Sequence, residues 1–300
     1  MNSNQRTLLV GDNPFHGVSH LSLEKARSRG QTVTAPQYAA EVVGAALESG
    51  ATGCLFSINT VTLDVLRLLP DAAGRQPPSL YAIVPYTYEY VRLAVLLGGI
   101  PGLATKLAKE IALSGNWKAV LYGINGVVAR NPQALLNAYM AYELSRVRAA
   151  IKNRVSLAAV LIHEIATDMA LGLEMEWFFK AHVAFIKKQG LRPGFNTRNL
   201  PLLVRQFRRW GISLEGIALA APFNAVGFQM CPSREACESA LMGVPEAEAI
   251  GFSLLSGGYG RPREAAAYAA SLPHLKGVAL GVSRPEQARE TFQLFREALG

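Results

Sequence analysis

The chain has 300 residues, of which half are hydrophobic and 17% are charged, and it carries a formal net charge of +8. This composition excludes an intrinsically disordered chain, and the apolar runs are all shorter than the ~18 residues that a membrane-spanning helix needs. The basic runs are short and lie in helix-like segments without a nucleic-acid-binding motif. We therefore expect a globular protein with no nucleic acid and no membrane among its partners. The N-terminal MNSNQRT has no apolar signal core, which predicts a cytoplasmic location.

Short apolar runs recur along the chain and alternate with amphipathic stretches. The runs lie at residues 8–11, 52–58, 80–85, 157–162, 191–196, 216–222, 248–254 and 276–281. They are continuous rather than alternating, as is typical of parallel strands covered on both faces. The stretch 36–49 has Pro at its first turn and Gly50 past its end, which predicts a helix. Eight strands separated by helices predict a (β/α)₈ TIM barrel as one domain over residues 1–300. A doubly wound open sheet is the alternative.

A long stretch after the third predicted strand does not fit a simple barrel. Residues 88–152 show 3.6-residue periodicity over most of their length, which predicts a largely helical insertion at one barrel rim. Within it, residues 116–123 (NWKAVLYG) are also compatible with a strand. If residues 116–123 form a strand of the barrel, one of the eight short apolar runs cannot be a barrel strand.

Polar residues follow the predicted strands, where a TIM barrel places its active site. Those after the first six runs are Asp12, Asn13, His16, His20, Asn59, Thr60, Tyr86, Tyr88, His163, Glu164, Asp168, Asn196, Thr197, Arg198, Asn224 and Gln229. From this set we select His163, Glu164, Asp12 and His16 as catalytic residues. The expected substrate or cofactor contacts are Asn13, Asn59, Tyr86, Asn196, Arg198, Asn224 and Gln229.

His163 carries most of the expected chemistry. An imidazole at a strand end can act as an acid or base near neutral pH, or as a metal ligand. The alternative is a hydrogen-bonded core histidine. Asp12 or His16 together with His163 or Glu164 could bind Zn²⁺ or a related divalent metal, although no recognised ligand motif is present.

The last two loops contain features suited to an anion. Ser256, Gly257 and Gly258 could present backbone N–H groups to it, and Ser283 with Arg284 precedes a helix start at Pro285. The positive net charge favours such a phosphate site, whereas the alternative is that the glycines only form turns. We therefore expect a small anionic or phosphorylated ligand.

Five segments of the second half resemble the aldo-keto reductase family. They are VLIHE, GFNTRN, APFNAVGF, IGFSLLSGG and GVSRPEQARETF, in the order in which that family has its fourth to eighth strands. The resemblance implies NADP as a cofactor, and the matching positions are Asn196, Asn224, Ser283, Arg284 and Arg289. It also implies catalysis by Asp, Tyr, Lys and His. Of these four only His163 is matched, because the second and third strands end in FSINT and AIVPYTY.

The sequence leaves three functions open. The first is a barrel enzyme using acid/base or metal-assisted chemistry on a small anionic substrate, as a lyase, isomerase or hydrolase. The second is an NADP-dependent, aldo-keto reductase-like oxidoreductase with an altered set of catalytic residues. The third is a catalytically silent barrel that binds a ligand or a partner, with residues 88–152 as the surface for a partner or a homo-oligomer.

Overall fold

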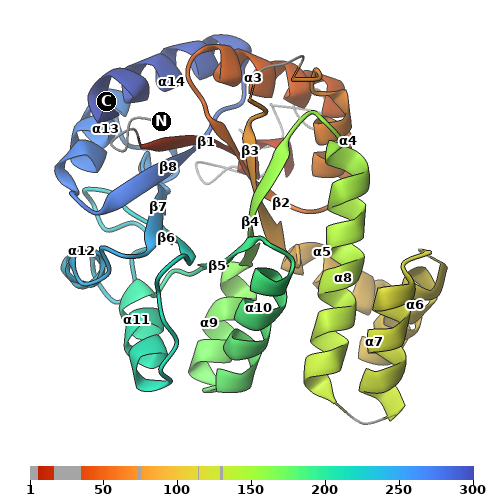
Figure 1. Cartoon of the computed structure of the whole chain (residues 1–300). Coiled ribbons are helices and arrows are strands. Elements are labelled where there is room, and N and C mark those ends of the chain that lie inside the picture. Colours follow the sequence, from red (N-terminus) through yellow and green to blue (C-terminus); the bar gives the residue numbers. More distant parts are fainter. Residues whose placement is uncertain (1–5, 17–34, 73–75, 114, 129–130) are drawn as a thin grey trace.

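Eight parallel strands close into a barrel in chain order, and β8 pairs with β1 (Figure 1). The computed structural model describes residues 6–16, 35–72, 76–113, 115–128 and 131–300. The strands are β1 (Thr7–Gly11), β2 (Gly53–Ser57), β3 (Ser79–Val84), β4 (Ser156–Ile162), β5 (Arg192–Asn196), β6 (Ala218–Pro222), β7 (Glu248–Phe252) and β8 (Leu275–Gly281). This confirms the predicted TIM barrel, and each predicted strand is found within two residues of its bounds.

Helices cover the outside of the barrel. They are η1 (Asn13–His16), α3 (Pro36–Glu48), α4 (Thr60–Leu68), α5 (Thr87–Leu96), α6 (Ile100–Leu113), α7 (Trp117–Val128), α8 (Pro132–Ile151), α9 (Glu164–Gly172), α10 (Glu176–Lys188), α11 (Leu200–Arg209), α12 (Arg234–Met242), η2 (Ser256–Gly258), α13 (Pro262–Ser271) and α14 (Pro285–Leu299). The helix expected at 36–49 is confirmed by α3. Within the described residues, none of these helices is both long and apolar enough to cross a membrane.

The insertion after β3 is helical, as its periodicity predicts. Residues 116–123 belong mostly to helix α7, so the interpretation of this stretch as a ninth strand is wrong. The long helix α8 packs against α4 and α10 on one side and against α7 on the other. In Figure 1, α6 and α7 therefore lie beyond α8, away from the barrel.

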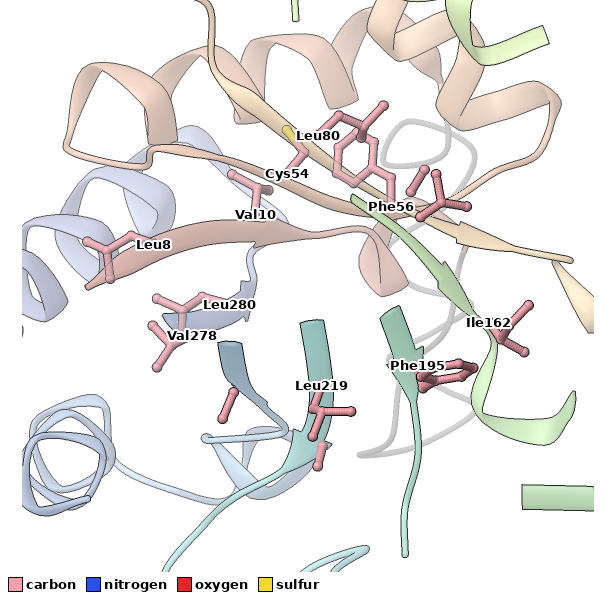
Figure 2. Packing of buried hydrophobic residues seen from close by; sticks show 14 of the residues in the cluster. Leu8, Val10, Cys54, Phe56, Leu80, Ile162, Phe195, Leu219, Val278 and Leu280 are labelled. Atoms are coloured by element: carbon pink, nitrogen blue, oxygen red, sulfur yellow. The ribbon is translucent and has the colours of Figure 1, made fainter. Parts of the chain in front are cut away.

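Successive strand residues point to opposite sides of the barrel wall. On β1, Leu8 and Val10 belong to the cluster between the strands and the helices, whereas Leu9 belongs to the cluster inside the barrel. Figure 2 shows the outer cluster with residues from several strands, among them Phe56, Leu80, Ile162, Phe195, Leu219 and Val278. Each such side chain contributes about 1.5–3 kcal/mol through burial. Burial on both faces explains why the strands are continuous apolar runs in the sequence.

The inner cluster fills the interior of the barrel, between the strands. It consists of Leu9, Leu55, Tyr81, Ile83, Ala159, Leu161, Ala218, Ala220, Ile250 and Ala279. Tyr81 donates a 2.6 Å hydrogen bond to Glu248 Oε1, which satisfies its hydroxyl inside the barrel. Three members of this cluster, Leu55, Ile83 and Ala279, also line an open pocket at the carboxyl ends of the strands.

Candidate active site

A pocket of about 550 Å³ opens at the carboxyl ends of the strands. Its apolar wall includes Leu55, Ile83, Phe252, Leu254 and Ala279. Its polar wall is formed by residues that end or follow all eight strands, with Ser57 from β2 and Gln229 from the segment after β6. This is the end of the barrel at which TIM-barrel enzymes place their catalytic residues, and the size suits a small organic ligand.

Asp12 follows β1 and is fixed by two hydrogen bonds on one carboxylate oxygen. Its Oδ2 accepts from the backbone N of Ser57 at 2.6 Å and from His16 Nε2 at 2.9 Å. The side chains of Asp12 and His16 are only 6% and 7% exposed. Asp12 lines the pocket. The carboxylate is therefore held between the ends of β1 and β2 by the 3-10 helix η1, which carries His16.

Four rings gather where β1, β3 and β4 end. The His16 ring is stacked on the Tyr86 ring, with centroids 4.9 Å apart and an interplanar angle of 29°. Tyr86 and Tyr88 both contact His163 edge to face, at 6.5 Å and 5.7 Å. Burial and the charge of Asp12 raise the pKa of Tyr86 to about 12, so its hydroxyl stays protonated at neutral pH.

His163 ends β4 and is the N-cap of α9. Its Nδ1 accepts a hydrogen bond of 3.2 Å from the backbone N of Ile165, so the ring proton of the neutral imidazole lies on Nε2. Burial lowers the pKa of His163, although the nearby Glu164 and Asp12 charges raise it in part. The side chain therefore presents a neutral N–H donor at the pocket wall.

Glu164, Asn196 and Arg198 form a network on the β5 side. Glu164 Oε2 accepts from Asn196 Nδ2 and Glu164 Oε1 accepts from Arg198 Nη2, both at 2.9 Å. A reversed Asn196 amide would set its oxygen against the carboxylate, which fixes the amide orientation. Asn196 Oδ1 is consequently buried without a hydrogen-bond partner in the protein. Asn196 lines the pocket, and a ligand donor could satisfy this acceptor only if it displaced the groups that cover Oδ1 in the free protein.

Asp168 lies behind this network. Its carboxylate accepts hydrogen bonds from the hydroxyl of Thr197 and from the backbone N of Arg198. Burial raises the pKa of Asp168, while these two hydrogen bonds lower it. Asp168 thus anchors the loop after β5 and does not line the pocket.

The opposite wall comes from the segments after β7 and β8. Gly257 and Gly258 line it with positive φ values of 72° and 103°, which glycine adopts without strain. The backbone N–H groups of Ser256 and Gly258 donate to Ser253 and Leu255 carbonyls. The loop therefore does not offer the three free N–H groups expected from its sequence.

The structure divides the residues selected from the sequence into two sets. Asp12, Asn13, Tyr86, His163, Glu164, Asn196, Arg198, Gln229, Gly257, Gly258 and Ser283 line the pocket. His16, Asn59, Asn224, Ser256 and Arg284 do not line it, and His20 lies outside the described residues.

The described residues of the second set occupy other positions or make structural hydrogen bonds. Asn59 is the N-cap of α4 and forms a capping box with Thr62. Asn224 holds its own loop through two hydrogen bonds to the backbone of Phe228. Ser256 is buried, whereas Arg284 is exposed at the start of α14. Arg289 is also exposed, further along that helix.

The charged side chains of the pocket do not form the cationic wall that the positive net charge of the chain would favour. Its described lining contains the carboxylates of Asp12 and Glu164 and one cationic side chain, Arg198, and no lysine. The positive net charge of the chain is therefore not concentrated on this wall. In the part of the chain that the structure describes, no group of three or more His, Cys, Asp or Glu side chains is arranged to hold a metal ion.

Three pocket features escape a reading of the sequence. Ser57 acts through its backbone N–H, which leaves no trace in the side-chain pattern. Ser253 lines the pocket with φ 55° and donates to Gln229 Oε1 at 2.9 Å. Gln287, in the first turn of α14, accepts from the backbone N of Ser283 at 3.1 Å. A polar side chain in the first turn of the last helix was the available signal for Gln287.

Comparison with known proteins supports the fold. No protein-family model and no curated protein matches the sequence. Two solved structures from Pseudomonas aeruginosa, each titled as a candidate aldo-keto reductase, match at a TM-score of 0.57 with 14% identity. The matches cover 99% of this chain and 92% and 91% of those chains. The chain is therefore a TIM barrel with a distant resemblance to aldo-keto reductases.

Proposed function

We propose that the protein is a nicotinamide-dependent oxidoreductase that reduces a small carbonyl compound. The likeness to the two bacterial structures over nearly the whole chain favours this function over the lyase, isomerase or hydrolase considered first. The observation that carries the proposal is the buried, unpartnered Oδ1 of Asn196, a residue that lines the pocket wall, so that its acceptor lies next to the space for a ligand. A primary carboxamide, such as that of nicotinamide, has the N–H donor that this acceptor lacks.

Other parts of the pocket are compatible with the cofactor. The Gly257–Gly258 backbone has no side chains to obstruct a ligand lying along it, and Ser283 and Gln287 supply polar groups beside the N-terminus of α14. A helix N-terminus attracts phosphate groups. Asn196 would hold the nicotinamide carboxamide, and the segments after β7 and β8 would hold the remainder of the cofactor. When bound, a reduced nicotinamide supplies a hydride.

The remaining chemistry falls to His163 and Tyr86. In this proposal the Nε2–H of His163 donates a hydrogen bond to the substrate carbonyl oxygen and polarises it. The Tyr86 hydroxyl then gives its proton to the same oxygen as the alcohol forms, and the phenolate regains a proton from water. With a pKa of about 12 the Tyr86 hydroxyl is protonated at neutral pH, and the alkoxide left by hydride transfer is a stronger base than the phenolate and can take its proton.

Cofactor binding and turnover test the proposal together. NADPH and NADH are titrated calorimetrically into the wild type, Asn196→Leu and the control Asn153→Ala, whose side chain is exposed. We expect one cofactor to bind and to be consumed with small aldehydes. We also expect a roughly tenfold or greater loss of affinity in Asn196→Leu alone, because a hydrogen bond to a buried group contributes about 1–3 kcal/mol. If neither cofactor binds the wild type, the proposal is wrong.

A further inference from the structure

We infer that Asp12 and His16 are a positioning pair that fixes the ring of Tyr86 at the pocket wall, with His16 acting through Tyr86 and not on the substrate. The inference rests on the proposed function only where Tyr86 serves as the proton donor. The sequence suggested that both residues act directly in catalysis. In the structure His16 does not line the pocket, so it is not placed to contact a substrate there.

The pair is anchored at the ends of two strands. The backbone N of Ser57, at the end of β2, donates to Asp12 Oδ2, and that same oxygen accepts from His16 Nε2. The backbone O of Asp12 also accepts from the backbone N of Phe15 at 2.8 Å, which closes the turn that carries His16. Phe15 is fully buried in the core. The imidazole is thus held at both its ring nitrogen and its backbone.

Tyr86 depends on this anchored ring for one of its faces. His16 covers it at 4.9 Å with nearly parallel planes, while Tyr88 and His163 contact it edge to face. Tyr86 is the N-cap residue of α5, a helix of which no residue is buried. Because α5 offers the phenol no buried support, the stack with His16 is the main contact that sets the direction of its hydroxyl.

This arrangement predicts a particular kinetic effect. Proton transfer needs the Tyr86 hydroxyl within hydrogen-bond reach of the substrate oxygen, and small displacements lower the rate strongly. Loss of the stack should therefore lower kcat while it leaves the cofactor affinity unchanged, because Asn196 and the β7–β8 wall lie elsewhere in the pocket. Substitution of a residue that only stabilises the fold would not lower kcat while it left the cofactor affinity unchanged.

The test uses the full chain labelled with 3-fluorotyrosine and observed by ¹⁹F NMR. The chain has ten tyrosines, and Tyr86→Phe assigns the resonance of interest. His16→Gln keeps an N–H donor for Asp12 but removes the ring, whereas His16→Phe keeps a ring but removes the donor. His274→Ala is the control, since His274 lies before β8 at the other end of the barrel.

In His16→Gln we expect the Tyr86 resonance to shift and its titration midpoint to fall towards that of an exposed tyrosine. We also expect kcat to fall about 10- to 100-fold at unchanged cofactor affinity, with partial recovery in His16→Phe. An unchanged Tyr86 resonance in folded His16→Gln overturns the inference. If His16→Gln does not fold, His16→Leu replaces it as the variant without a ring, and an unchanged Tyr86 resonance in folded His16→Leu overturns the inference. The resonance needs no turnover, so an inactive wild type with a shifted signal contradicts only the proposed function.

Discussion

The backbone N of Ile165 donates to Nδ1 of His163, and this single contact determines which ring nitrogen carries the proton. His163 consequently has two separable roles, as the N-cap of α9 and as an Nε2–H donor in the pocket. Asparagine is a strong N-cap residue but cannot place a donor where Nε2 lies.

Substitution of His163 should separate these roles. We expect His163→Asn to retain wild-type stability but to lose about 100- to 1000-fold in kcat, as when one donor to a reacting oxygen is removed. His163→Ala should lose the same activity and, in addition, about 1 kcal/mol of stability with the cap. Steady-state kinetics and urea unfolding check both. Full activity in His163→Asn would exclude a role in polarising the substrate.

The pH dependence of reduction follows from the two ionisable groups to which the proposed mechanism assigns a proton, His163 and Tyr86. Neutral His163 is required, and burial lowers its pKa below that of an ordinary histidine. Activity should therefore fall on the acid side, at a lower pH than an ordinary histidine would give. Tyr86 has a pKa of about 12, so no loss from its ionisation is expected up to pH 10. A kcat profile from pH 4 to 10 is the measurement, and an alkaline limb near pH 8 would contradict the assignment of Tyr86.

A second histidine should control stability in acid. His182 is fully buried, its Nε2 lies 3.1 Å from the carbonyl O of Val160, and burial lowers its pKa to about 4. The unfolded chain, with a histidine pKa near 6.5, therefore binds the proton first as the pH falls. The free energy of unfolding should decrease by about 3 kcal/mol between pH 6.5 and pH 4 and level off below.

Urea unfolding at several pH values measures this decrease. His182→Gln can keep a donor to Val160 and removes the titration, so its stability should vary less over the same window. His274→Ala, which changes a less buried histidine, is the control and should retain the full dependence. Identical pH dependence in His182→Gln and wild type would rule out His182 as the source.

Gly53 allows β2 to approach β3 closely. A Cβ at this position would lie 2.0 Å from the backbone O of Ser79, so Gly53→Ala must separate the two strands. We expect a loss of about 3 kcal/mol or more. Gly44→Ala is the control, because a Cβ there meets nothing within 4 Å. Equal urea midpoints for the two variants would contradict the close packing.

The barrel was predictable because its strands are buried on both faces. Leu8, Leu9 and Val10, for example, are all apolar but are buried in different places. Leu8 and Val10 pack between the strands and the helices, whereas Leu9 packs inside the barrel. The rule that strand ends form the site also placed Asp12, His163 and Asn196 correctly at the pocket. Their roles in catalysis and binding remain predictions.

The directions of individual side chains were not predictable. Asn224 follows β6 as the rule requires, yet its amide turns back to the Phe228 backbone. Arg284 precedes α14 but is exposed. Local hydrogen bonds and the exit angle of each loop decide such cases, and neither is encoded by the residue type alone. Net charge does not locate charges either, and among the described lining residues two carboxylates face one guanidinium.

The pairing of β8 with β1 also has a consequence for biosynthesis. The pocket joins Asp12, which follows the first strand of the barrel, to Ser283 and Gln287, which follow the last. No nascent chain that ends before β8 can contain a complete site, however much of the barrel has already formed. Strand β1 must wait with one edge unpaired until β8 has been synthesised, a state in which exposed edges invite wrong partners.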